Sequence, residues 1–153
     1  NEARRSLDLP VLVTIAASFA LGNALEKTGA AAYLGNSIVA TAGSDAWLLL
    51  ALCYLSVMVL TELIANNAAA MLMLPVVLAI TQTAGLNDVP YVMAVMMAAS
   101  ASFATPIGYQ CNLMVYGPGG YRFSDFLRIG VPMNLLMAAV TTTAIPFIWP
   151  LQG

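Results

Sequence analysis

Long apolar stretches alternate with short polar interruptions along this chain of 153 residues. No charged residue occurs within Leu9–Leu25, Leu63–Asn87, Val89–Tyr121 or Ile129–Gly153. A membrane-spanning helix needs about 20 mostly apolar residues. Each of these windows can therefore hold a membrane-embedded element, and we expect an all-α membrane protein.

The hydrophobic pattern predicts single helices near both ends of the chain. Leu9–Leu25 is expected to be a membrane helix, with Pro10 in its first turn, where a missing N–H costs nothing. Val131–Leu151 is expected to be the last span, after a short polar connection over Arg122–Arg128. Thr28–Ser44 contains three glycines, which predicts an interfacial or broken helix rather than a span.

An unusual junction separates two apolar helices in the middle of the chain. The first covers Ala46–Leu60 and the second runs through Ile80, and the segment between them reads TELIANNAAA. Two ordinary spans would be joined by a charged or turn-rich loop, because their connection lies in water. The sequence therefore predicts a re-entrant hairpin with its tip at Asn66-Asn67, buried where protein or a polar cavity satisfies its backbone.

A second interruption follows the helix expected over Tyr91–Phe103. Pro106 removes a backbone donor and clashes with the preceding turn, and Gly108 loosens the helix further. The segment Ala104–Asn112 should therefore break the helix, with the hydrogen-bond ladder failing around Thr105–Gly108. The apolar run resumes to Tyr116, before a turn.

Composition supports lipid as the solvent for most of the chain. Hydrophobic residues make up 61% of the sequence and charged residues only 8%, whereas a soluble domain usually carries about a quarter. No basic cluster indicates nucleic acid, and no hydrolase motif or paired carboxylates indicate an enzyme. Cys53 and Cys111 lie in apolar surroundings and are expected to be buried thiols, without a disulfide or a metal.

Arginine placement orients the expected helices. Arg4, Arg5, Arg122 and Arg128 should lie in the cytoplasm, because cytoplasmic loops are enriched in Lys and Arg. The predicted hairpin then enters and leaves from the outside.

The two polar interruptions, Thr61–Asn67 and Ala104–Asn112, form the candidate functional site. Discontinuous helices expose N–H groups that attract anions and carbonyl groups that coordinate cations, as in many secondary transporters. Neutral donors and acceptors are added by Asn66, Asn67, Thr105, Gln110 and Asn112. The alternative is that a proline kink and a few asparagines only pack helices together.

Glu62 is the only ionisable residue between Asp45 and Asp88. An intramembrane carboxylate is costly and tends to be functional, so Glu62 is a candidate for coupling transport to a cation. Alternatively, its carboxylate reaches interfacial water or a neighbouring hydroxyl.

Three segments resemble the divalent anion:sodium symporter family, in particular bacterial permeases whose transport halves flank cytosolic regulatory domains of the potassium-uptake C-terminal type. They read FALGN with EKTG at 19–29, TELIANNAAA at 61–70, and FATPIGYQCNLMVYGPGGY at 103–121. The resemblance implies that residues 1–153 are the C-terminal half of a transport domain from a longer chain. It also implies an inverted-repeat fold with a re-entrant hairpin and a broken helix in each half.

The resemblance also implies roles for individual residues. The Ser-Asn-Thr signature of the family's hairpin tips reads Ala65-Asn66-Asn67 here, so the asparagine is kept and both hydroxyls are lost. Sodium would bind Thr61, Asn66 and the carbonyl of Ala104. The residues expected to line the substrate site are Asn66, Asn67, Thr105, Pro106, Gly108, Gln110 and Asn112.

The resulting hypothesis is a sodium-coupled importer of a divalent anion, either sulfate or a di- or tricarboxylate. It would be a multi-pass protein of the inner membrane and a homodimer, with sodium as its coupling ion and no cofactor. Proton coupling through Glu62 is an alternative. Another is a non-transporting scaffold or channel-like subunit, in which the two interruptions would lie apart.

Overall fold

The computed structural model describes residues 20, 24, 27–43 and 45–152. The helix predicted over Leu9–Leu25, with Arg4 and Arg5 before it, lies almost wholly outside the described residues. Every element in the described part is a helix, and a single isolated bridge joins Leu86 to Gln152. The expected all-α class is confirmed.

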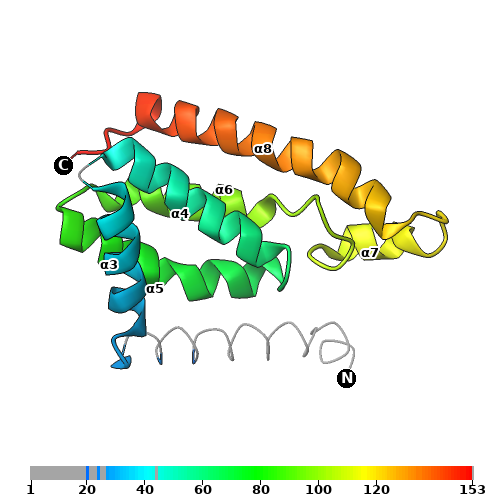
Figure 1. The fold of residues 1–153 in the computed structure, drawn as a ribbon, viewed down its shortest axis with the longest axis horizontal. Coiled ribbons are helices and arrows are strands. Elements are labelled where there is room, and N and C mark those ends of the chain that lie inside the picture. Colours follow the sequence, from blue (N-terminus) through cyan, green and yellow to red (C-terminus); the bar gives the residue numbers. More distant parts are fainter. Residues whose placement is uncertain (1–19, 21–23, 25–26, 44, 153) are drawn as a thin grey trace, which may run out of the picture.

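The predicted hairpin is formed by α4 (Ala46–Thr61) and α5 (Asn66–Ala84), which run in opposite directions (Figure 1). Asp45 starts α4, because its Oδ1 accepts hydrogen bonds from the N–H groups of Trp47 at 3.0 Å and Leu48 at 3.2 Å. The turn is Glu62–Ala65, so the tip lies just before the predicted Asn66-Asn67. Those two asparagines instead form the start of α5.

Both open ends of the hairpin lie at one end of the bundle. The Tyr91 hydroxyl, in the first turn of the next helix, donates to the Ala46 carbonyl at 2.7 Å. In Figure 1 the start of α4 and the end of α5 lie together, opposite the Glu62–Ala65 turn. Asp45 and Asp88 therefore lie at the same end of the bundle, as the predicted hairpin requires.

The predicted broken helix consists of α6 (Asp88–Ser100) and α7 (Gln110–Tyr116), with nonhelical backbone between them. The break begins at Ala101, three residues before the predicted Ala104. Pro106 alone does not explain this early end. This segment instead makes hydrogen bonds to the hairpin tip through the Ser102 hydroxyl and the Ala104 N–H, which sequence periodicity does not reveal.

The last helix, α8, covers Phe123–Ile148 and begins eight residues before the predicted Val131. The predicted polar connection Arg122–Arg128 is therefore wrong, because all of it except Arg122 is helical. Asp125 stabilises this start: its Oδ2 accepts the Arg122 N–H at 2.8 Å, and its charge suits a helix N-terminus. Pro132 and Pro146 lie inside the helix without ending it.

The glycine-rich segment forms one helix, α3 (Ala30–Ala42). Gly29 and Gly43 have positive φ angles of 74° and 66° and flank its two ends. These glycines therefore bound a helix rather than break one. At 13 residues, α3 is about 20 Å long, too short to span a bilayer.

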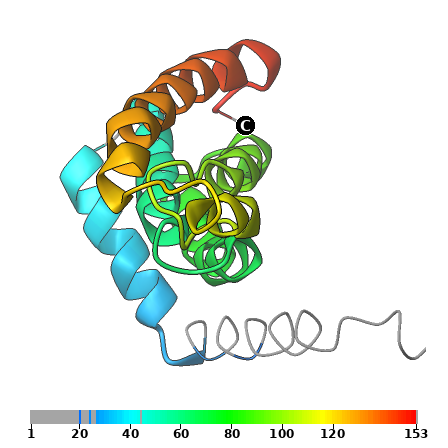
Figure 2. The ribbon, with the colours of Figure 1, turned by 90° about the vertical axis from the view of Figure 1, so that its right-hand side faces the viewer.

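Packing among the helices centres on α6, which contacts both arms of the hairpin and α8. Its buried residues Tyr91, Ala94 and Ala98 lie against Tyr54 and Val57 of α4 in one hydrophobic core. Seen along the bundle, α8 lies across the face opposite α5 (Figure 2). Packing in this core determines where along the bundle the hairpin tip meets the break between α6 and α7.

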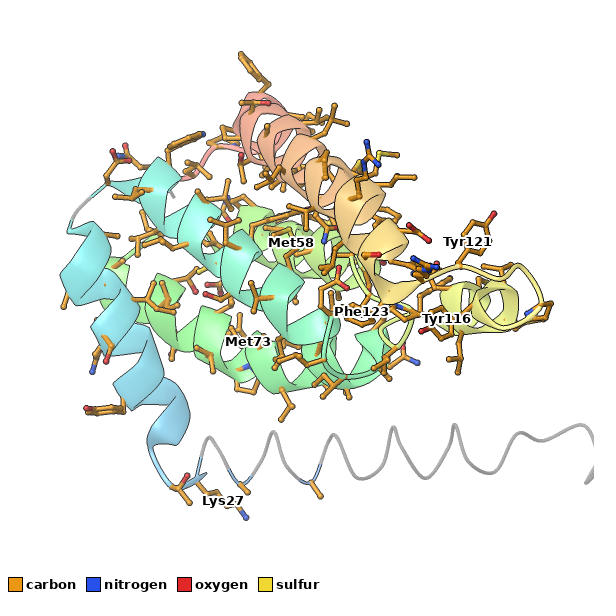
Figure 3. The ribbon with its side chains drawn as sticks, turned by 45° about the vertical axis from the view of Figure 1, so that its right-hand side comes forward. Lys27, Met58, Met73, Tyr116, Tyr121 and Phe123 are labelled. Carbon is orange, nitrogen blue, oxygen red and sulfur yellow. The ribbon has the colours of Figure 1, made fainter. Side chains whose placement is uncertain are left out.

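Two helices in the described part, α5 and α8, are long and apolar enough to cross a membrane. Aromatic residues gather at both ends of the bundle. Tyr116, Tyr121 and Phe123 lie around the α7–α8 connection (Figure 3), and Trp47 lies at the other end, donating to the Thr142 carbonyl at 3.1 Å. Trp and Tyr are enriched where a helix meets the membrane–water interface.

Candidate functional site at the hairpin tip

The two polar interruptions are in direct contact. The Ser102 hydroxyl donates to the Thr61 carbonyl at 3.2 Å, and the Thr105 hydroxyl donates to the Glu62 carbonyl at 2.8 Å. The Ala104 N–H donates to Glu62 Oε1 at 2.9 Å. The scaffold alternative requires these segments to lie apart, and they do not.

The residues predicted to bind sodium surround the end of α4. Thr61 is fully buried, and its Oγ1 lies 3.0 Å from Asn66 Oδ1 and 2.8 Å from the Ala99 carbonyl oxygen. No described group donates a hydrogen bond to the Ala104 carbonyl, and the N–H of the same residue contacts Glu62. The tip and the break thus bring Thr61, Asn66 and Ala104 into one region, where oxygen atoms of all three are candidate cation ligands.

The start of α5 is the candidate anion contact. Ala65 caps the helix without a side-chain hydrogen bond, and among the described residues no acceptor binds the N–H groups of 66–68. Such N–H groups and the helix dipole favour negative charge. Asn67 lies in this first turn with an exposed side chain. This site consists of backbone N–H groups, so it does not need the two hydroxyls of the Ser-Asn-Thr signature that are absent from this chain.

Several predicted substrate residues make internal contacts instead. Besides donating to Glu62, Thr105 accepts the Gly108 N–H at 3.1 Å, and Pro106 is buried. Asn112 Nδ2 donates to the carbonyls of Ser102 and Thr105, both at 3.1 Å. In this arrangement Thr105, Pro106 and Asn112 help to determine the backbone conformation of the break. Gln110 begins α7, and its side chain lies outside the described part of the structure.

Gly108 lies against the tip with no room for a side chain. A Cβ there would lie 2.0 Å from Ser102 Oγ and 2.7 Å from the Thr61 carbonyl oxygen. The absence of a side chain therefore lets the break fold back onto the end of α4.

We expect Gly108→Ala to weaken transport about tenfold, because the Thr61 backbone must shift to admit the methyl group, at a cost of about 1–3 kcal/mol. Initial uptake rates, normalised to protein in the membrane, measure the effect. The matched control is Gly117→Ala, where a Cβ meets nothing within 4 Å. Equal rates for the two variants would contradict this close packing.

Two residues that sequence reasoning missed complete the site. Asn134 of α8 donates from Nδ2 to Glu62 Oε1 at 2.6 Å, and Ser102 Oγ lies 3.5 Å from Glu62 Oε2. The available signal for Asn134 was weak: it is a lone asparagine between apolar residues of the last span.

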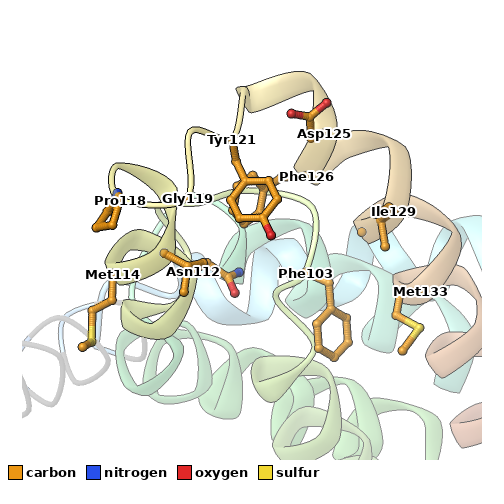
Figure 4. Close-up of a pocket in the computed structure, with 12 residues that line it drawn as sticks. Phe103, Asn112, Met114, Pro118, Gly119, Tyr121, Asp125, Phe126, Ile129 and Met133 are labelled. Atoms are coloured by element: carbon orange, nitrogen blue, oxygen red, sulfur yellow. The ribbon is translucent and has the colours of Figure 1, made fainter.

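A cavity of about 740 Å³ lies beside the break, between α7 and α8 (Figure 4). Phe103 and Asn112 line it, and Asp125 is the only charged residue among its described lining residues. Among the described residues no lysine or arginine contacts the site, so neither the cavity nor the tip offers a cationic side chain to an anion. Within the described part, helix N-termini are the source of positive charge at the site.

Comparison with known proteins consistently finds transporters. Residues 1–151 match the profile of a family described as citrate transporter. The chain is 43% identical over 144 residues to an uncharacterised transporter of Synechocystis, covering 93% of the chain and 23% of that protein. It is 37% identical over 143 residues to sodium/sulfate cotransporter 2 of Chlamydomonas reinhardtii (92% and 16%).

A more distant relative is sodium-dependent high-affinity dicarboxylate transporter 3 of Caenorhabditis elegans. It is 28% identical over 131 residues, which cover 86% of the chain and 23% of that protein. The chain thus spans a quarter or less of the length of these curated relatives. All of them are named as transporters rather than enzymes.

Proposed function

The chain belongs to the citrate transporter family, and we propose that it forms part of a secondary transporter that couples sodium entry to uptake of a divalent anion. The chain would be the C-terminal half of a transport domain, paired with an N-terminal half of the same protein. That protein would be a multi-pass homodimer of the inner membrane.

The observation that carries this proposal is the contact between the hairpin tip and the α6–α7 break. Thr61 Oγ1 and Asn66 Oδ1 are 3.0 Å apart, and Ala104 adjoins Glu62, the residue after Thr61. A sodium ion bound by these two side-chain oxygens and the Ala104 carbonyl would bridge the two segments. Unwound carbonyls and half-helix ends coordinate sodium in other secondary transporters.

The bound sodium would also prepare the anion site. It adds positive charge beside the start of α5, where unpaired N–H groups face no lysine or arginine from the described residues. The proposed substrate residues are the first-turn pair Asn66 and Asn67, with Thr105, Pro106, Gly108, Gln110 and Asn112 around the break. Binding of anion and cation would then be cooperative, because each lowers the electrostatic cost of the other.

Sulfate and di- or tricarboxylates are the substrate classes we propose. Relatives named for sulfate and for dicarboxylates both support this choice. The backbone N–H groups at the start of α5 would suit either class of oxyanion.

Uptake by the full-length protein in proteoliposomes tests the function. Labelled sulfate, succinate and citrate are supplied separately, with an inward sodium gradient or with choline in place of sodium. We expect at least one anion to accumulate only with sodium, and accumulation to persist when a protonophore removes any proton gradient. Accumulation that needs a proton gradient and ignores sodium would instead support the proton-coupled alternative. No accumulation under either gradient would overturn transport of these anions.

A further inference from the structure

Glu62 joins three elements through one carboxylate at the hairpin tip. Its Oε1 accepts hydrogen bonds from Asn134 of α8 at 2.6 Å and from the Ala104 N–H of the break at 2.9 Å. Its Oε2 lies 3.5 Å from the Ser102 hydroxyl. Both partners of Oε1 are N–H donors, so this one oxygen is the acceptor that α8 and the break share.

Asn134 is the member of this group that comes from α8. It is 3% exposed and lies near the midpoint of the 26-residue helix, at the depth of the tip. While its Nδ2 contacts Glu62, its Oδ1 accepts the Phe103 N–H at 3.4 Å. The amide therefore binds the tip with one end and the break with the other.

The same contacts fix the break on both sides of Ala104. Phe103 is bonded to Asn134, the Ala104 N–H to Glu62 Oε1, and the Thr105 hydroxyl to the Glu62 carbonyl. Three consecutive residues are thereby tied to the tip and α8. Gly130, one turn before Asn134, lets α8 approach: a Cβ there would lie 2.1 Å from the Phe103 carbonyl oxygen.

Within the described structure, no second charge faces Glu62. The tip, the break and α8 present Asn66, Ser102, Ala104 and Asn134 to this region, and none of them titrates. The nearest ionisable residue of α8 in sequence, Arg128, is six positions from Asn134, about 9 Å along the axis. The carboxylate is thus held by neutral donors alone.

We propose that Asn134 is a positioning residue for the sodium site: its amide, acting through Glu62, holds the Ala104 carbonyl beside Thr61 and Asn66. This inference rests on the proposed sodium-coupled function. It gives Glu62 a fixed structural role, because its Oε1 accepts from both the Asn134 amide and the Ala104 N–H and so links α8 to the break. Loss of the Asn134 donor releases Ala104, so sodium binding weakens although no sodium ligand has changed.

Asn134→Asp tests the assignment in the full-length protein. The substitution keeps the shape of the side chain and replaces the Nδ2 donor with an oxygen that faces Glu62. Two carboxylates at this distance cannot both be ionised without strong repulsion, but they can share a proton. A shared proton restores a hydrogen bond between positions 62 and 134, so lower pH should rescue the variant.

The measurement is the sodium concentration that gives half-maximal sulfate uptake, because sulfate stays a dianion across the pH range used. If the wild type transports only another anion, equilibrium binding of radioactive sodium to the purified protein replaces uptake at both pH values, because that measurement does not depend on the charge of the anion. At about pH 8 we expect Asn134→Asp to raise this concentration about tenfold, with recovery toward the wild-type value at about pH 5.5. Asn134→Ala should show a similar loss without recovery. Asn36→Asp, on the exposed surface of α3, adds the same charge as a control and should match the wild type at both pH values.

Three results would overturn the inference. One is Asn134→Asp with wild-type sodium dependence at both pH values, and another is loss in both Asn134 variants without recovery at low pH, which would mark simple packing. Thermal unfolding of the purified variants shows whether they fold. If Asn134→Asp is unfolded at about pH 8 but folded at about pH 5.5, the pair serves stability rather than sodium binding. Failure of the proposed function can be told apart from failure of this inference alone, because in the first case the wild type itself would take up anions without sodium. The inference would then fall together with the proposed function.

Discussion

Asn66→Ala is expected to lower sodium-driven uptake strongly while the protein remains inserted and folded. Insertion depends on the apolar length of the helices rather than on one amide. The fold should also survive, because the buried Thr61 hydroxyl keeps the Ala99 carbonyl, 2.8 Å away, as its acceptor. The variant removes a proposed sodium ligand and leaves the surrounding packing intact.

The size of this effect follows from the loss of one bond to a charged group. Such a loss costs about 1.5–3 kcal/mol, which corresponds to a decrease of about 10- to 100-fold in apparent sodium affinity. Uptake at a fixed sodium concentration near the wild-type midpoint should therefore fall about 5- to 50-fold. Met96→Ala, 58% exposed on α6, is the control and should change sodium dependence little. Unaltered sodium dependence in Asn66→Ala would mean that the tip serves packing only.

Gly130→Ala is expected to have the second large effect, by forcing α8 away from the break. A Cβ at this position would lie 2.1 Å from the Phe103 carbonyl oxygen and 2.4 Å from Ala104 Cα. These are backbone atoms, which cannot rotate aside as a side chain can. Overpacking of this kind costs about 1–3 kcal/mol, and the displaced segment carries the proposed sodium ligand Ala104. We expect a decrease in uptake of tenfold or more.

Helix propensity predicts the opposite sign, which makes this variant informative. Alanine is better than glycine in a helix interior by about 1 kcal/mol, so Gly130→Ala would stabilise α8 if nothing contacted it. Gly117→Ala, with open space around its Cβ, is again the control. Thermal unfolding and sodium-dependent uptake should both decline for Gly130→Ala alone. A more stable and fully active variant would show that α8 does not touch the break.

The broad architecture could be predicted from sequence because its signals are local. Charge-free windows mark membrane segments, and the asparagines among alanines mark the hairpin. The motif at 103–121 marks the broken helix, and the family match confirms the resemblance drawn from these motifs. The sequence predicts the tip slightly too late, since the two asparagines are more conspicuous than the mostly apolar segment Glu62–Ala65, and only the backbone distinguishes a turn from a helix start.

The connections between segments could not be predicted, because they depend on contacts between distant residues. Asn134 meets Glu62 across 72 positions, and nothing in the neighbouring sequence records that pairing. The early end of α6 has the same cause. Ser102 and Ala104 leave the helical ladder to bind the tip, whereas the sequence directs attention to Pro106. The charged residues 122–128 also appeared to be a loop, although Asp125 makes them a well-capped helix start.

Equilibrium binding of radioactive sodium to the purified full-length protein tests the central claim, that the tip and the break together hold a sodium ion. Wild type, Asn66→Ala and Met96→Ala are compared over a range of sodium concentrations. The account predicts that Met96→Ala binds sodium with the wild-type affinity, and that Asn66→Ala binds one sodium ion about 10- to 100-fold more weakly. Equal binding by all three proteins would contradict it.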